Sequence, residues 1–191
     1  MAQTIIAFCD AEESREYRAV LSHAVVDSWS SVEAFFRDLA RALLANVPEA
    51  RKSERLKNIK LSASEWSSDA WAYADSVVRE IERDTSDREA KRIKSVALLE
   101  RIGVKCDIHT SHERDLFELF QLRNLIVHQR GVADRHFINR CPWMSIVEGQ
   151  RIGLTVDRVI DYIEITIRAA QLAVDSVLGS YINNRPTNSA N

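Results

Sequence analysis

The sequence contains few of the residues that interrupt helices. Its 191 residues include five glycines and three prolines, well below the roughly 12% that these two residues together reach in average proteins. Sheet architectures need many turns, and glycine and proline dominate turns. Their scarcity therefore favours long helices over a sandwich or a barrel, and it excludes a collagen-like chain.

Cysteines and long apolar runs are scarce as well. The three cysteines, Cys9, Cys106 and Cys141, lie far apart and form no C-x-x-C pair, which excludes a disulfide scaffold and indicates reduced thiols. The apolar run at residues 5–8 follows no basic residue and is followed at once by acids, so it is not a secretory signal. No apolar stretch approaches the roughly 20 residues that span a bilayer. We therefore expect a soluble, cytoplasmic protein with no membrane partner.

A large excess of charge of one sign is also lacking. The chain has 26 basic and 28 acidic side chains, a net charge of −2, which argues against a surface that is basic all over. The segment from Arg123 to Arg140 is an exception, because it holds four arginines and one acid, Asp134. Such a segment is typical of a phosphate-binding surface and equally of a solvated basic loop. Within it we expect Arg130 and Arg135 to bind RNA if the surface is functional.

Apolar residues recur at steps of three and four over most of the chain, which is the period of an amphipathic helix. We predict helices over residues 10–45, 65–83, 86–102, from 110 to 129 or 130, and about 155–178. The serines at 28, 30 and 31 could kink or divide the first helix. Capping boxes, Ser86-x-x-Glu89 and Thr110-x-x-Glu113, begin the third and fourth helices. The pattern predicts an all-α bundle.

The region between the last two helices lacks the helical period. Gly131 is expected at the C′ position after the fourth helix, and Thr155 is expected to cap the last one. Residues 146–152 predict a turn or a small two-stranded hairpin. We expect one domain over residues 1–182 and a disordered tail over 183–191, which is polar and contains Pro186.

The long C-terminal helix carries more apolar residues than one face needs. A stripe that includes Val156, Ile160, Ile163 and Ile167 is expected to face the core, and Ile165 lies with Leu172 on a second face. A helix with two apolar faces contacts a partner subunit as well as its own core, or it simply exposes isolated aliphatic side chains.

Three polar residues that could take part in catalysis interrupt the apolar fourth helix: Arg123, Asn124 and His128. At 100° per residue, Asn124 and His128 lie about 40° apart, and Arg123 lies about 140° from His128. Arg123 supplies a cationic fork that suits phosphate oxygens. An imidazole and a guanidinium suffice to cleave RNA without a metal, although such a pair is also a common surface feature of helices.

The motif resembles a known family. The run Arg123-Asn124-Leu125-Ile126-Val127-His128 matches the R-x4-6-H signature of HEPN domains, and residues 121–134 are similar to the LRNxxVHxxGxxD block of bacterial HEPN nucleases. Gly149-x-x-Ile152-x-Leu154-Thr155 before a long helix, and more loosely the segment at 31–35, are similar as well. The likeness covers most of the chain, and only the Arg–His block is specific.

The resemblance implies a HEPN-like helical bundle that dimerises and acts as a metal-independent endoribonuclease, in toxin–antitoxin or anti-phage defence systems. Arg123 and His128 match the catalytic pair, and Asn124 matches the polar position after the arginine. Arg130 replaces the tyrosine that one toxin branch modifies, which argues against inactivation by adenylylation. RNA, a second copy of the chain, and an antitoxin or defence-system protein are the implied partners, and no cofactor is implied.

A physical argument also favours a dimeric site. Cleavage of a phosphodiester needs both a base and an acid, and the motif offers one histidine per chain. A two-fold axis beside the fourth helix would bring two His128 and two Arg123 side chains around one scissile phosphate. The alternative function is a non-catalytic HEPN-fold module that binds RNA or a partner protein.

Other sites have weaker support in the sequence. Cys106-x-x-His109-x-x-His112 approaches a zinc-ligand spacing but lacks a fourth ligand, so no metal site is assigned. No P-loop, GxGxxG or GxSxG motif is present. Trp29, Trp66 and Trp71 fall on predicted helices and are expected in the core. Trp143, in the loop after the motif, is the one tryptophan expected near a substrate.

Overall fold

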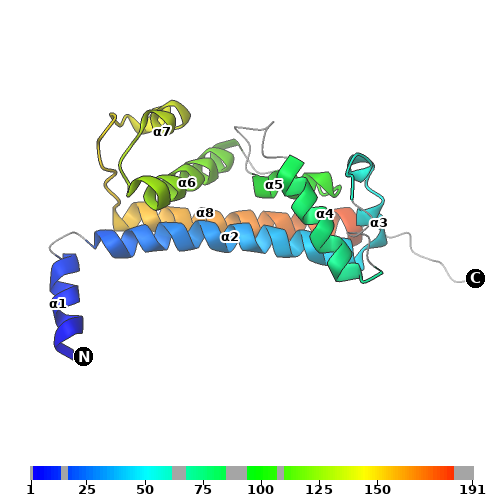
Figure 1. Ribbon diagram of the computed structural model, residues 1–191, viewed down its shortest axis with the longest axis horizontal. Helices are drawn as coiled ribbons and strands as arrows, with labels where there is room; N and C mark the ends of the chain where they lie inside the picture. Colours follow the sequence, from blue (N-terminus) through cyan, green and yellow to red (C-terminus); the bar gives the residue numbers. More distant parts are fainter. Residues whose placement is uncertain (1, 14–16, 62–67, 85–93, 107–109, 183–191) are drawn as a thin grey trace, which may run out of the picture. The chain divides into compact units, whose positions relative to one another are not determined.

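The computed structural model describes residues 2–13, 17–61, 68–84, 94–106 and 110–182 (Figure 1). These residues are mostly helical and contain no strand, which confirms the all-α class. The α-helices are α1 (Ala2–Glu13), α2 (Arg18–Asn46), α3 (Pro48–Arg51), α4 (Ala70–Asp84), α5 (Lys94–Arg101), α6 (Thr110–Gln129), α7 (Arg135–Arg140) and α8 (Val156–Val177). Shorter turns are η1 (Glu54–Leu56), η2 (Pro142–Met144) and the π-helical η3 (Leu178–Ile182).

The chain divides into two compact units. The first comprises residues 1–31 and 114–166, and the second comprises residues 32–113 and 167–191. The candidate motif lies wholly in the first unit. The single domain expected over residues 1–182 stays a prediction, and the tail expected to be disordered over 183–191 lies outside the described residues. No helix among the described residues is both long enough and apolar enough to cross a bilayer.

The helix predicted from residue 10 is two helices in the structure. Between α1 and α2, Tyr17 has a left-handed backbone (φ 55°) and its N–H donates to the carbonyl of Glu12 (2.7 Å). The buried Glu12 carboxylate accepts the N–H of Ala19 (2.9 Å) in the first turn of α2, where a negative charge is favourable. From Arg18 onward α2 is uninterrupted, so the serines do not break it (Figure 1). Ser28 and Ser30 donate instead to carbonyls four residues earlier.

The helix predicted over residues 65–83 begins later than expected. The helix α4 starts at Ala70, where Asp69 accepts the N–H of Trp71 (2.7 Å) in the manner of an N-cap. The helix α5 ends at Arg101, and Gly103 follows with φ 92°, which confirms the expected stop. The capping box at 86–89 and the expected start at residue 65 lie outside the described residues.

The motif helix α6 spans Thr110–Gln129, which agrees with the predicted end at residue 129 or 130, but the turn that follows it differs from the expected one. The left-handed conformation expected at Gly131 begins one residue earlier, at Arg130 (φ 55°), and Gly131 follows with φ 74°. A left-handed non-glycine residue costs about 1 kcal/mol. The Arg130 carbonyl accepts a hydrogen bond from Arg151 Nη1 (3.1 Å), and this contact offsets part of that cost.

The hairpin considered for residues 146–152 is not confirmed. These residues form a turn in which the N–H of Gln150 donates to the carbonyl of Val147 (3.1 Å). An isolated antiparallel bridge instead joins Val132 to Arg151. This bridge connects the segment that follows α6 to the segment that precedes α8 by backbone hydrogen bonds.

The short helix α7 was not expected from the sequence. It begins after Asp134, whose Oδ1 accepts the N–H of Phe137 (2.7 Å), and the Phe137 side chain is buried. Asp134, the last residue of the segment 121–134 that resembles the HEPN motif, is therefore the N-cap of α7 in this structure.

Asp134→Ala is expected to lower the free energy of unfolding by about 1 kcal/mol, because the Phe137 N–H loses its acceptor. Chemical denaturation measures this loss. Asp134→Asn keeps a capping oxygen and should be close to wild type. Equal losses in the two variants would contradict the capping role.

The stripe of α8 that was expected in the core is largely exposed. In the first unit, Ile160 is 46% exposed whereas Tyr162 and Ile165 are buried. In the second unit, Ile167 is 53% exposed whereas Ala169 is buried. The buried face of α8 combines Tyr162 and alanines with Ile165 and Val159, so a count of large aliphatic side chains does not identify that face. Two apolar faces are present, as expected, with their roles exchanged.

Candidate functional site

The motif side chains project from the last two turns of α6. Its opposite side is anchored in the core, since Leu122 and Leu125 are 1% and 4% exposed. This burial fixes the rotation of the helix and therefore the directions in which Arg123, Asn124 and His128 point. Arg123 and His128 are five residues apart, which corresponds to about 7.5 Å along the helix axis.

Arg123 and Asn124 form a hydrogen-bonded pair. Arg123 Nη1 donates to Asn124 Oδ1 (3.0 Å), and both side chains are half-buried. Among the described residues, the buried Nε of Arg123 has no hydrogen-bond partner. The amide therefore orients the guanidinium while donors remain for an external acceptor, and a buried donor without a partner is costly for stability alone.

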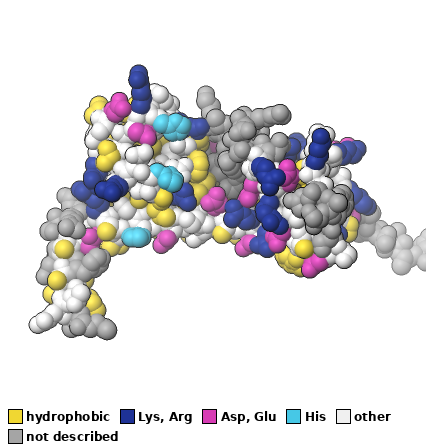
Figure 2. Space-filling model, viewed as in Figure 1, with side chains coloured by type: hydrophobic (Ala, Val, Ile, Leu, Met, Phe, Trp, Pro, Cys, Tyr) yellow, Lys and Arg dark blue, Asp and Glu magenta, His cyan; other side chains and the backbone are white. Residues whose placement is uncertain are grey.

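His128 is an exposed side chain in the last turn of α6. Its neighbour Val127 is also exposed, at 48%, so this edge of the helix is partly apolar. Histidine side chains reach the surface over α2, α6 and α7 on the face shown in Figure 2. The exposure leaves His128 accessible to a substrate.

The basic segment after the motif has mixed roles. Arg130 and Arg135 are exposed, Arg130 just beyond α6 and Arg135 as the first residue of α7, so both remain accessible to phosphate. Arg140 lies over the ring of Phe117 at 5.6 Å, a cation–π contact that gives it a structural role. Within the described residues, the structure brings Arg123 and Asn124 together and shows no hydrogen bond between them and Arg130, Arg135 or His128.

A buried polar network below the motif was missed in the sequence. Glu118 on α6 is 1% exposed, and its carboxylate accepts hydrogen bonds from Tyr162 Oη, from Arg158 Nη2 and from Trp143 Nε1 (2.6 Å). The network joins α6 to η2 and to α8. A single acid within the apolar run Leu116–Phe120 was the available signal, because a buried carboxylate needs partners.

The network determines the protonation states of its members. Burial raises the pKa of Glu118, but the hydrogen bonds from Tyr162, Arg158 and Trp143 outweigh burial and bring the pKa below its ordinary value. Burial, together with the charge of Glu118, raises the pKa of the Cys141 thiol to about 12. Cys141 therefore stays protonated at neutral pH and is not a nucleophile.

The tryptophans expected in the core differ in their burial. Trp29 is buried and contacts Phe120, with 5.0 Å between ring centroids, as expected, but Trp71 is 49% exposed and its expected burial is wrong. Trp66 lies outside the described residues. Trp143 is 41% exposed with its indole N–H directed to Glu118.

The zinc-like spacing of Cys106, His109 and His112 is described only in part. Cys106 is buried and accepts a hydrogen bond from Ser176 Oγ (3.9 Å), and His109 lies outside the described residues.

The arrangement combines an oriented guanidinium with an accessible imidazole on one helix. It can neutralise an anion and transfer protons.

Comparison with models of known protein families, with curated proteins and with solved structures gives no match. The described residues contain no group of three or more histidine, cysteine, aspartate or glutamate side chains arranged to hold a metal ion.

Proposed function

We propose that the protein is a metal-independent endoribonuclease that cleaves single-stranded RNA, with the HEPN-like motif of α6 as its catalytic element. The observation that carries the proposal is the Arg123–Asn124 pair beside an exposed His128. The amide holds the guanidinium in place through Nη1, and the N–H groups of the half-buried guanidinium outside this hydrogen bond are available to an anion. These are the properties of a group that stabilises charge on a phosphate.

In the proposed reaction, one imidazole accepts the proton of the ribose 2′-hydroxyl. The 2′-oxygen attacks phosphorus and the bond from phosphorus to the 5′-oxygen breaks, while a second imidazole donates a proton to that leaving oxygen. The products are a 2′,3′-cyclic phosphate and a 5′-hydroxyl. Arg123 neutralises the charge that develops on the phosphoryl oxygens. Arg130 and Arg135 contact flanking phosphates.

The second imidazole comes from a second copy of the chain. Each motif has one histidine, and an acid and a base are both required. The exposed Val127 next to His128 gives this edge of α6 an apolar contact for a symmetric partner. In the same unit Val156, Ile160 and Ile163 expose apolar surface on α8, which supports dimerisation. A role in a toxin–antitoxin or anti-phage system, and a matching antitoxin or defence protein, belong to this proposal.

The test is incubation of the purified protein with single-stranded RNA in EDTA. We expect cleavage that leaves 2′,3′-cyclic phosphate ends, and none by an Arg123→Ala/His128→Ala double variant purified in parallel. If both proteins are inactive but bind RNA or another protein, the non-catalytic module is the correct function and the nuclease is excluded.

Mixing experiments test the shared site. In an equal mixture of wild-type and His128→Ala chains that exchange freely, activity is expected to fall to about one quarter of that of pure wild type, because one quarter of random dimers carry two intact chains. A fall to about one half would show that each chain acts alone.

A further inference from the structure

A pocket of about 270 Å³ lies on another side of α6 from His128, within the first unit. Three arginines are among the residues that line it, Arg18 from α2, Arg130 and Arg151, and no acidic residue lines it. All three arginines are exposed and, among the described residues, none of them forms an ion pair. Of the residues that line the pocket, Arg130 alone has a role in the proposed ribonuclease reaction.

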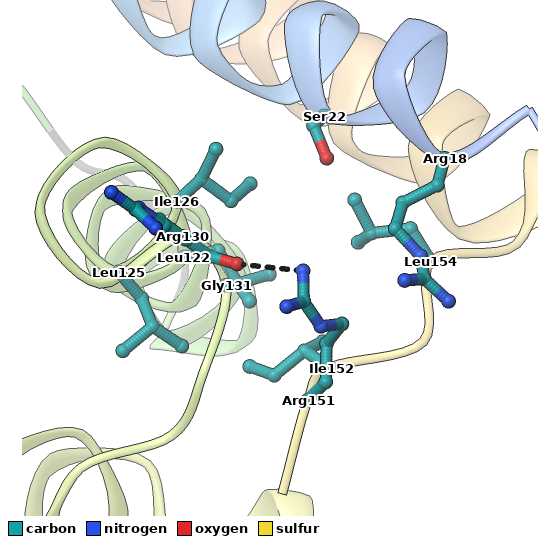
Figure 3. Close-up of a pocket in the computed structure, with 10 residues that line it drawn as sticks. All are labelled: Arg18, Ser22, Leu122, Leu125, Ile126, Arg130, Gly131, Arg151, Ile152 and Leu154. Carbon is teal, nitrogen blue, oxygen red and sulfur yellow. Dashed lines mark hydrogen bonds between the residues drawn. The ribbon is translucent and has the colours of Figure 1, made fainter. Parts of the chain in front are cut away.

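Several polar groups of the pocket border a common space. In Figure 3 the guanidinium groups of Arg18 and Arg151 and the hydroxyl of Ser22 border the same space, whereas the Arg130 side chain turns away and contributes its carbonyl. That carbonyl already accepts one hydrogen bond from Arg151 Nη1 (3.1 Å). Two guanidinium groups with no anion between them repel each other, and a shared dianionic ligand would remove that repulsion.

The remaining lining is aliphatic. The pocket is also lined by Ile126, Leu154 and the buried Leu122 and Ile152, and Figure 3 shows Leu154 beside Arg18 and Ile152 beside Arg151. No aromatic ring and no side-chain amide lines the pocket, so it offers neither the stacking surface nor the hydrogen-bond pattern that a nucleobase requires. The volume lies just below the usual range of ligand pockets, about 300–1,000 Å³. A small molecule with one strongly charged end and a short apolar body fits these properties.

We propose that this pocket binds a small phosphate monoester with a short apolar body. Arg18 and Arg151 bind the phosphate oxygens, Ser22 donates a further hydrogen bond, and Ile126 and Leu154 contact the body. A dianionic phosphate uses both guanidinium groups, whereas one carboxylate leaves part of the repulsion in place. Because Arg151 also contacts the carbonyl of Arg130, the residue that follows α6, the ligand would lie next to the end of the motif helix. The proposal is independent of ribonuclease activity.

The test is calorimetric titration of the full chain with hexyl phosphate, with inorganic phosphate and hexanol as the separate halves of the ligand. We expect hexyl phosphate to bind at least about tenfold more tightly than inorganic phosphate, and hexanol not to bind. Adenosine monophosphate is expected to bind more weakly than hexyl phosphate. Equal binding of inorganic phosphate, or tighter binding of adenosine monophosphate, would overturn the proposal.

Variants locate the binding site. Arg18→Gln and Arg151→Gln are each expected to weaken binding of hexyl phosphate about tenfold or more. Arg168→Gln removes the same charge from an exposed position of α8 outside the pocket and should have no effect. Leu154→Ala should weaken hexyl phosphate about fivefold and leave inorganic phosphate unchanged. Arg18 has no hydrogen bond to a described residue, so its variant stays informative if Arg151→Gln proves unstable. An equal loss of affinity in Arg168→Gln would show that net charge, and not the pocket, determines binding, and it would overturn the proposal.

The headgroup of phosphatidic acid is also a phosphate monoester. Vesicle sedimentation distinguishes binding of this lipid from binding of a free phosphate monoester. The volume admits a short tail only, so we expect no greater sedimentation with phosphatidic acid vesicles than with phosphatidylcholine vesicles. Sedimentation with phosphatidic acid without binding of hexyl phosphate would overturn the assignment to a free ester.

Discussion

His128→Ala is expected to reduce the rate of RNA cleavage by about 1,000-fold. Proton transfer by a positioned side chain contributes roughly 10²- to 10⁴-fold, and a symmetric site loses both its acid and its base when every chain carries the substitution. Single-turnover cleavage of a labelled RNA in EDTA measures the loss. His128 is exposed, so the unfolding temperature should not change, and this separates a chemical effect from a folding effect.

Arg123→Lys and Arg135→Ala are the matched variants for the first prediction. Lysine keeps the charge of Arg123 but loses the fork and the contact to Asn124, and we expect about 100-fold slower cleavage at saturating RNA. Arg135→Ala removes an exposed charge and should weaken RNA binding severalfold, with an effect that fades at high salt. Unchanged rates in both His128→Ala and Arg123→Lys would exclude the motif as the catalytic site.

Glu118→Ala is expected to lower the free energy of unfolding by about 3 kcal/mol. The substitution leaves the buried Tyr162 hydroxyl and the Trp143 indole N–H without their acceptor, and it opens a cavity beside Arg158. Each buried group without a partner costs about 1–3 kcal/mol. Arg158 is 42% exposed, so water solvates part of its charge and limits the loss. Denaturant titration measures the difference.

Acid unfolding gives a second measurement of the same network. The pKa of Glu118 is lower in the folded protein than the ordinary value of 4.5, so its ionised form contributes stability above pH 4.5, and that stability is lost as the pH falls through the lower folded pKa. Glu118→Gln keeps one acceptor oxygen and removes this titration. We expect a smaller loss than for Glu118→Ala and a shallower decline in stability below pH 4.5. Acid sensitivity identical to wild type would exclude Glu118 as the source.

Sequence reasoning predicted the motif helix more accurately than its surroundings. The extent of α6 and the placing of Arg123, Asn124 and His128 on one helix follow from local periodicity, because residues within a few turns determine both. The helix end differed by one residue, since a contact from Arg151 supports Arg130 in a conformation that glycine would normally adopt. The short helix α7 was missed because six residues give too little periodic signal, although Asp134 already marked its start.

The sequence by itself determined the helical class, the position of the motif on one helix and the presence of two apolar faces on α8. Only the tertiary structure decided that Tyr162, and not Ile160, faces the core, that Glu118 pairs with Arg158, and that Arg18 and Arg151 share a pocket. The physical reason is the range of the interactions. Helical period and capping depend on residues a few positions apart. Burial and pairing depend on which distant surfaces fit together, and side-chain volume and loop closure decide that fit.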